Sequence, residues 1–122
     1  MKTIKFILLT LILINLSCTN DSEDDLTEPV ILNQNEPVTF NNVSSIFQNN
    51  CISCHSNPPV NGAPMSLINY NDIKDAVENR NLIDRISRQT SENGAMPLGG
   101  PRLPQNLIDL VILWQEDGLL EN

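Results

Sequence analysis

Two cysteines and a histidine stand together near the middle of the chain, in the order Cys51, Ile52, Ser53, Cys54, His55. In a helical turn, side chains three positions apart project on the same side, so both thiols can face one partner. His55 follows directly and is the only histidine among the 122 residues. This spacing lets two thiols fasten a flat organic group while the imidazole binds a metal ion within it.

The C-x-x-C-H pattern is typical of c-type haem attachment, in which the thiols form thioethers and the histidine binds iron. We therefore expect one covalent haem c on Cys51 and Cys54, with His55 as the first axial ligand. Three alternatives remain. A zinc site wants four ligands, and the sequence offers only these three. A thioredoxin-like redox pair needs a βαβ pattern that is not visible, and a local disulfide leaves His55 unexplained.

A methionine is the expected second axial ligand, because the chain has no other histidine. Met1 leaves with the predicted export signal, so Met65 and Met96 remain. Met96 lies in a loop rich in glycine and proline, far enough from His55 to reach the opposite face of a haem. Met65 follows His55 by only ten residues, and we expect it to fill space against the haem or the core. The alternative for Met96 is a solvent-facing loop position.

The folded part is expected to be all-α, with three to five helices. Apolar residues at helical spacing predict one helix that starts after a cap at Asn41 or Asn42, and three more over Asp72–Glu78, Asn81–Arg88 and Gln105–Asp117. Asn71 is the expected cap of the second helix and Gly118 ends the last one. The side chains expected to face the core are Val43, Ile46, Phe47, Ile73, Ala76, Val77, Leu82, Ile83, Ile86, Leu107, Leu110, Val111 and Trp114.

Residues 1–17 predict an export signal, with two lysines followed by an apolar run from Phe6 to Ile14. The run is too short for a membrane span, which takes about 20 apolar residues. The alternative is a buried helix. The stretch before Cys18 resembles the lipobox of bacterial lipoproteins, which implies a lipid on Cys18 that anchors the chain to a membrane. The alternative is a plain secreted protein with a lone thiol, a liability in an oxidising compartment.

Residues 18–38 are polar and acidic, and we expect a flexible tether there. The acidic residues after Cys18 also resemble the surface-export signal of Bacteroidetes lipoproteins, with a simple solvated linker as the alternative. From Cys18 to Asn122 there are five Lys and Arg against fifteen Asp and Glu, and 5 − 15 gives a charge of −10. This charge excludes a nucleic-acid partner and predicts a protein partner with a basic docking surface.

From about Thr39 to Leu119 the chain resembles the small monohaem cytochrome c domains of bacterial lipoproteins and extracellular enzymes. The matching features are Ile46-Phe47 one turn before Cys51, the pattern from Cys51 to His55, the Met96-Pro97 loop and a C-terminal helix bearing Trp114. The resemblance implies a cytochrome c-like domain over residues 39–122, with its helices wrapped round one covalent haem.

The same resemblance implies further details of the packing. The first and last helices should cross, with Phe47 and Trp114 near the haem edge. Longer family members of the mitochondrial type have glycine at this crossing, where Val43 stands here, which implies a wider or differently arranged crossing. A proline carbonyl, of Pro58 or Pro59, should accept the N–H of the iron-binding histidine.

With both axial positions filled, a substrate has no open site on the iron. We therefore expect a one-electron carrier and not an enzyme, exported and lipid-anchored on the periplasmic or outer face of a bacterial membrane. If Met96 is not a stable ligand, the alternative is a haem-based sensor of small molecules or a peroxidase-like enzyme. A third class is a lipoprotein without haem whose cysteines are structural.

Overall fold

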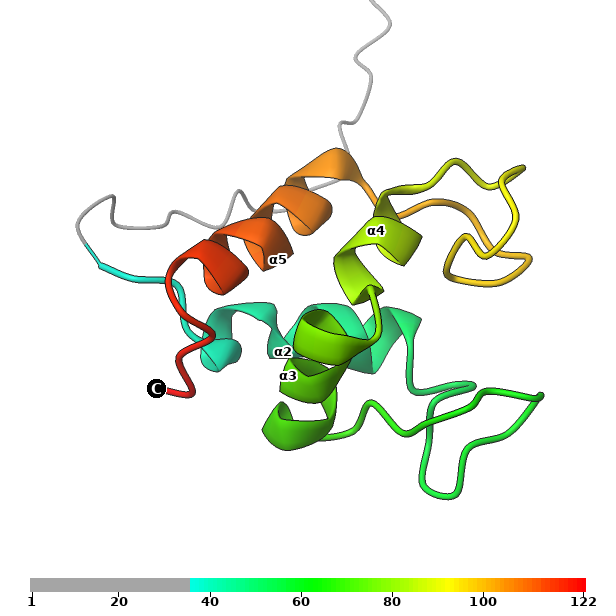
Figure 1. Ribbon diagram of the computed structural model, residues 1–122, viewed down its shortest axis with the longest axis horizontal. Coiled ribbons are helices and arrows are strands. Elements are labelled where there is room, and N and C mark those ends of the chain that lie inside the picture. Colours follow the sequence, from blue (N-terminus) through cyan, green and yellow to red (C-terminus); the bar gives the residue numbers. More distant parts are fainter. Residues whose placement is uncertain (1–35) are drawn as a thin grey trace, which may run out of the picture. The chain divides into compact units, whose positions relative to one another are not determined.

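The structure, a computed structural model, describes residues 36–122, and this part of the chain is all-α (Figure 1). Its four helices are α2 (Phe40–Asn50), α3 (Tyr70–Asn79), α4 (Leu82–Ser87) and α5 (Gln105–Glu116). The described residues form no strand, only an isolated bridge between Thr39 and Leu120. The expected all-α class is confirmed for this part. The expected export signal, the lipidation at Cys18 and the tether up to residue 35 lie outside the described residues.

Helix α2 begins directly after Thr39, earlier than a cap at Asn41 or Asn42 would allow. The backbone N–H and the hydroxyl of Thr39 both donate to the side-chain oxygen of Asn42, at 2.8 and 3.1 Å. Asn42 is therefore not the cap but the third helical residue, reaching back to the cap as in a capping box. The expected inward-facing residues are buried: Val43, Ile46 and Phe47.

The first turn of α3 also lies earlier than expected. Asn69, not Asn71, caps this helix, because its side chain accepts a hydrogen bond from the N–H of Asp72 at 3.0 Å. α3 passes into α4 through Asn81, whose φ of 54° is a left-handed conformation that asparagine tolerates better than most residues. This sharp link packs α4 against α3. The buried residues of the pair are Ile73, Ala76, Val77, Leu82 and Ile86, while Ile83 is half-buried.

Helix α5 packs against both α2 and α4. Its buried residues are Ile108, Leu110, Val111 and Trp114. Leu107, which we expected on this face, is only half-buried, whereas Ile108 is fully buried. A helix that contacts neighbours on two sides needs an apolar face wider than one stripe, which explains the difference.

The end of α5 confirms the expected role of Gly118, which has a φ of +90°. Its N–H donates to the carbonyl of Gln115 at 3.1 Å, and the N–H of Leu119 donates to the carbonyl of Trp114 at 2.9 Å. These two bonds form a Schellman motif, which turns the chain back at the end of a helix. The returning chain then meets the start of α2, where the N–H of Phe40 donates to the carbonyl of Leu120 at 2.8 Å.

Two long segments without helix, residues 51–69 and 88–104, extend to the same side of the helices (Figure 1). The first carries Cys51, Cys54 and His55, and the second carries Met96. The helices therefore separate two loops. Within the described part, these loops contain every residue that we predicted to bind a cofactor: Cys51, Cys54, His55 and Met96.

Candidate functional site

The two cysteines are presented by a turn that continues α2. The N–H of Cys51 donates to the carbonyl of Phe47 at 2.9 Å, as in the helix itself. The N–H groups of Cys54 and His55 then both donate to the carbonyl of Cys51, at 3.1 and 2.9 Å. These bonds extend the helical turn through the histidine, and both thiol-bearing residues line the same cavity.

His55 is the only buried polar or charged residue among residues 36–122, with 8% of its surface exposed. Its Nδ1 lies 2.8 Å from the carbonyl oxygen of Met65. A carbonyl oxygen only accepts hydrogen bonds, so Nδ1 carries the proton and the lone pair of Nε2 stays free for a metal ion. A second bond, from the N–H of Leu67 to the carbonyl of His55 at 2.8 Å, fixes the histidine backbone to the same segment.

The expectation that Pro58 or Pro59 accepts this N–H is wrong. The carbonyl of Pro58 accepts the hydroxyl of Ser56 instead, at 2.9 Å. The loop runs on past both prolines and returns to His55 only at Met65, where the hydroxyl of Ser66 also binds the carbonyl of Ser56 at 2.9 Å. The point at which the loop returns to His55 therefore determines which carbonyl accepts the Nδ1 proton.

The cavity between the two loops has a volume of about 920 Å³, at the upper end of the range for small-molecule and cofactor sites. Its walls bring together Cys51, Cys54, His55 and Met96, the four residues predicted to hold a cofactor. The apolar side chains around them come from the loops, from α4 and from the approach to α5, and they are Ala63, Pro64, Met65, Leu67, Leu82, Ile86, Pro97, Leu98 and Leu103. The cavity therefore combines an apolar wall with a small set of soft and nitrogen donors.

Both candidate methionines line this cavity and are half-buried. Met65 belongs to the segment that binds His55 through its backbone, so it comes from the histidine side of the site. Met96 comes from the other loop, where its N–H donates to the carbonyl of Arg85 at 3.0 Å. The two methionines thus approach the cavity from different loops, as the choice of Met96 over Met65 requires.

The two thiols are free in the described structure. Burial raises the pKa of the Cys51 thiol from its ordinary 9.0 to about 11, because the thiolate loses contact with water. Within residues 36–122, no three His, Cys, Asp or Glu side chains are grouped closely enough to hold a metal ion. Cys51, Cys54 and His55 therefore share a cavity without converging on one point, which a zinc site would need.

The aromatic residues are not where the family resemblance placed them. Neither Phe47 nor Trp114 lines the cavity. Trp114 instead packs against Phe40 and Tyr70, with ring centroids 5.8 and 6.3 Å away, and its indole N–H donates to the carbonyl of Leu120 at 2.9 Å. The turn after α5 supplies this carbonyl, so Trp114 packs where the start of α2 meets the last residues of the chain.

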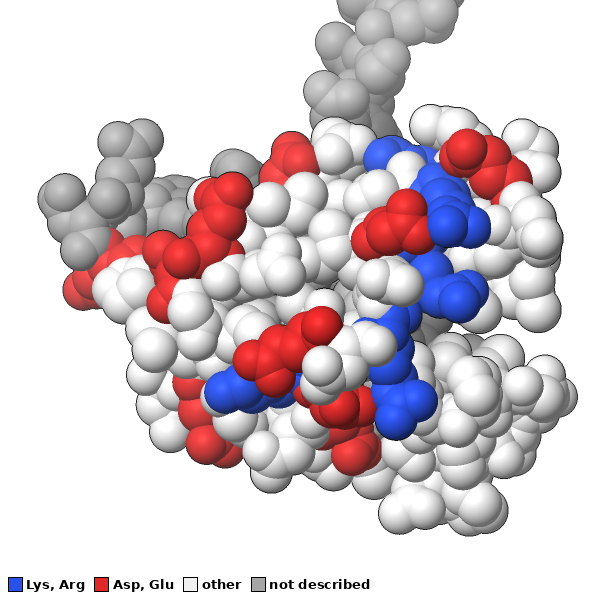
Figure 2. Space-filling view, viewed as in Figure 1, with Lys and Arg blue, Asp and Glu red and all other residues white. Residues whose placement is uncertain are grey.

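The charged groups at the cavity are basic. The four arginines of residues 36–122 lie between positions 80 and 102, and most of the basic side chains in Figure 2 form one band beside a hollow in the surface. Arg80 and Arg85 line the cavity, and no Asp or Glu is among its described lining residues. Net charge alone did not predict this local excess of positive charge, since residues 36–122 hold five basic and ten acidic side chains, a sum of −5.

Comparisons of the chain with protein-family models, with curated proteins and with solved structures found no match. Among the described residues, no helix has the length and apolar character needed to cross a membrane.

The site residues that sequence analysis missed are the Met65 carbonyl, Arg80 and Arg85. A backbone acceptor leaves no trace in residue types, and the two arginines reach the cavity only because α3 and α4 fold back on each other.

Proposed function

We propose that this protein is a c-type cytochrome that carries single electrons outside the cytoplasm. The observation that supports this most directly is that Cys51, Cys54 and His55 line one cavity of about 920 Å³ together with Met96, which comes from a separate loop. A cavity of this size with two thiols, an imidazole and a thioether fits a covalently held iron porphyrin better than it fits a bare ion.

Each of the four residues has a distinct part in this proposal. Cys51 and Cys54 would bond the ring through thioethers, and burial raises the pKa of the Cys51 thiol to about 11, which keeps that thiol protonated near neutral pH until attachment. His55 would bind iron through Nε2, with Nδ1 held by the Met65 carbonyl. Met96 would supply a soft sulfur on the other side, which favours ferrous iron and raises the reduction potential. The haem itself supplies one-electron oxidation and reduction.

The competing interpretations of the cysteines receive less support. A zinc site wants four ligands around one point, and the described residues offer no such group. A thioredoxin-like pair belongs after a strand in a βαβ unit, whereas here the cysteines follow α2 in an all-α part of the chain. A structural disulfide would give no role to the buried His55 or to the cavity beside it.

The proposed partner is another redox protein, and the proposed place is a bacterial membrane surface, through a lipid on Cys18. The acidic charge of the chain, −8 in all, favours a partner with a basic docking surface and disfavours nucleic acid. With both axial sites occupied, the protein would have no catalytic residue of its own.

The test is to produce the full chain together with a bacterial haem-attachment system and to measure intact mass and a pyridine haemochrome spectrum. We expect one haem per chain, bound through two thioethers. The matched control replaces Cys51 and Cys54 with alanine and should carry no covalent haem. A wild-type chain that emerges at its apoprotein mass would refute the proposal.

A second measurement separates an electron carrier from a sensor or peroxidase-like protein. The carrier should show a methionine–iron absorption band when oxidised and should bind carbon monoxide slowly when reduced, since the Met96 sulfur would compete with carbon monoxide for the iron. Rapid carbon monoxide binding with no methionine–iron band would favour the sensor or peroxidase-like function instead.

A further inference from the structure

The loop that carries Met96 has no helix of its own, yet it is joined to α4 by several hydrogen bonds. A six-residue helix leaves its last four carbonyls without partners inside the helix. Here the carbonyl of Arg85 accepts the N–H of Met96 at 3.0 Å, and the carbonyl of Ser87 accepts Nε of Arg102 at 3.1 Å. The open end of α4 therefore holds the backbone of Met96 and the far end of its loop.

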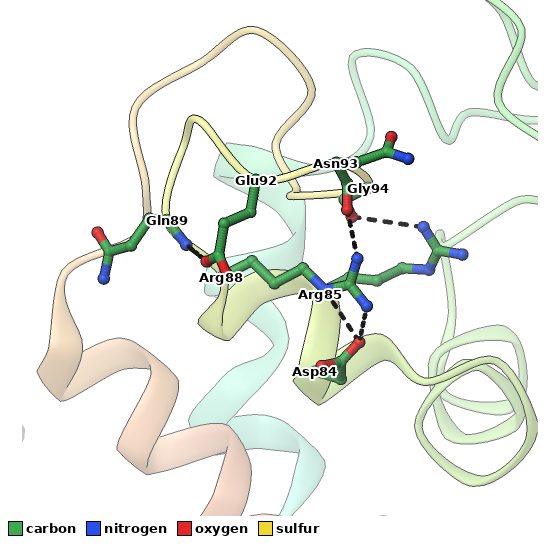
Figure 3. A network of polar contacts seen from close by, with 7 residues as sticks. All are labelled: Asp84, Arg85, Arg88, Gln89, Glu92, Asn93 and Gly94. Atoms are coloured by element: carbon green, nitrogen blue, oxygen red, sulfur yellow. Dashed lines mark hydrogen bonds and ion pairs between the residues drawn. The ribbon is translucent and has the colours of Figure 1, made fainter.

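Two arginine side chains of α4 reinforce this attachment (Figure 3). Nη1 of Arg88 donates to the carbonyl of Asn93, and Nη1 of Arg85 lies 3.4 Å from the carbonyl of Gly94. Arg88 is itself fixed by Asp84, whose Oδ2 accepts Nη2 at 2.6 Å and Nε at 3.1 Å. The Arg88 guanidinium thus bridges the helix and the loop three residues before Met96.

Gly94 makes this close approach feasible. Its φ is +80°, and a Cβ added there would lie 2.9 Å from Nη1 of Arg88 and 3.2 Å from Nη1 of Arg85. Gly99, in the same loop, has a similar φ of +73°, but an added Cβ would meet nothing within 4 Å. Both glycines allow the backbone to adopt a positive φ, whereas only Gly94 also leaves room for the two guanidinium groups.

These contacts matter because a methionine is a weak, neutral ligand that gains most when its loop is already ordered. Fixing one residue of backbone costs roughly 1–2 kcal/mol of conformational free energy, and a loop held in place before binding avoids that cost. The Arg88–Asp84 pair is partly exposed, with 36% and 57% of the side chains accessible, and such a pair alone contributes little to global stability. Its main effect is therefore local, on the segment that leads into Met96.

We propose that Arg88, together with Gly94, is a positioning group that holds the Met96 loop in place before cofactor binding and so determines whether Met96 stays on the iron. The inference rests on the proposed function. Loosening this contact would convert a closed electron carrier into a protein whose iron is open to small ligands, without touching any residue that binds the cofactor.

The test compares Arg88→Gln with Lys74→Gln in the full chain carrying haem. Lys74 is a matched control, because its replacement also removes one positive charge, while Lys74 does not line the cavity and its Nζ lies 3.4 Å from the Tyr70 hydroxyl. We expect R88Q to weaken the methionine–iron band and to bind carbon monoxide at least about tenfold faster than wild type, the size of effect that loss of one charge-assisted hydrogen bond produces. K74Q should match wild type.

A readout without haem follows the Met96 N–H by hydrogen exchange in the apoprotein. R88Q should exchange about tenfold faster at Met96, and K74Q should not. Gly94→Ala should reproduce the R88Q effects on the methionine–iron band and on exchange, while Gly99→Ala, with the same backbone strain in the same loop, should not.

Equal spectra, carbon monoxide rates and exchange rates in R88Q and K74Q would overturn the role of Arg88 and leave the proposed function intact. A wild-type chain that takes up no haem would overturn the proposed function and, with it, this role.

Discussion

The ring of His55 owes its orientation and its tautomer to one backbone oxygen. Because the Met65 carbonyl accepts the Nδ1 proton at 2.8 Å, Nε2 is the only ring nitrogen left to bind a metal ion. The same contact brings the Met65 side chain to the cavity wall. The backbone and the side chain of this residue therefore have separate roles, which substitution can distinguish.

Replacing each cavity methionine with leucine gives a matched pair of variants, since both side chains are half-buried on the same cavity. We expect haem-bearing Met96→Leu to lose the methionine–iron band and to bind carbon monoxide, because leucine offers no donor sulfur. Met65→Leu should keep the band, because its contact to His55 comes from the backbone. Optical spectra of the oxidised and reduced proteins provide the measurement. The opposite pattern would make Met65 the ligand.

The buried thiol of Cys51 gives a prediction about pH. Because its pKa is raised from 9.0 to about 11, its thiolate population at pH 8 falls about 100-fold, a factor of ten for each pH step. In an apoprotein with Cys18 and Cys54 changed to serine, iodoacetamide should therefore label Cys51 about 100-fold more slowly than in the same chain unfolded in urea. The folded state favours the protonated thiol, so this contribution to stability is present below pH 9 and is lost as the pH rises through about 11. Equal labelling rates in folded and unfolded chains would contradict the prediction.

At the scale of elements, the end of α5 joins the last helix to the start of the first. Gly118 has a φ of +90°, and an added Cβ would meet no atom within 4 Å. The cost of Gly118→Ala is thus almost purely backbone strain, about 1 kcal/mol, which corresponds to a fall of about 4–8 °C in the melting temperature. Gly118→Asn should cost less, because asparagine adopts this conformation more readily. Thermal unfolding followed by circular dichroism measures both, and an unchanged melting temperature in the alanine variant would show that the turn after α5 relaxes freely.

Helix type, the buried faces and the start of α5 at Gln105 could be predicted from the sequence, whereas the starts of α2 and α3 could not. The apolar spacing of Val43, Ile46 and Phe47 is enough to predict a buried face. The start of α2 depends instead on which of several neighbouring polar residues accepts a hydrogen bond. The structure shows that Asn42 accepts the N–H of Thr39, a choice that residue types alone do not indicate.

Some residues of the candidate site could likewise be predicted from the sequence, and others could not. Cys51, Cys54 and His55 could be predicted because their spacing is local, and Met96 because few other donors exist in the chain. Arg80 and Arg85 could not be predicted, because they reach the cavity through the left-handed turn at Asn81 and not through any pattern near the cysteines.

At the scale of the whole described part, charge is unevenly distributed. The acidic excess of residues 36–122 favours a basic partner, but the arginine band beside the hollow in Figure 2 is the part nearest the cavity. At physiological ionic strength, charges are screened beyond about 8 Å, so groups close to the cavity act on a docked partner more strongly than the net charge does. A partner that docks over the cavity would therefore meet positive charge first, so the proposed basic docking surface fits only the part of the domain away from the arginine band.

Because the described part is small, the proposed cofactor would affect its stability as well as its function. A domain of roughly 60–90 residues buries a smaller share of its chain's surface than a larger domain does, and is marginally stable on its own. Here a cavity of about 920 Å³ lies beside the core, and Leu98 on its wall is 78% exposed. Covering that side chain alone contributes about 1.5–3 kcal/mol, and each kilocalorie raises the melting temperature of so small a domain by about 4–8 °C.

We therefore expect the haem-bearing protein to melt at least about 10 °C above the Cys51→Ala, Cys54→Ala chain, which cannot attach haem. The difference should persist in reducing agent, because it comes from covered apolar surface and axial bonds and not from a disulfide between two thiols that are free in the structure. Differential scanning calorimetry of both chains at neutral pH measures it. Equal melting temperatures would mean that the two loops already hold their positions without the cofactor, and the stability of the domain would then come from the helical core alone.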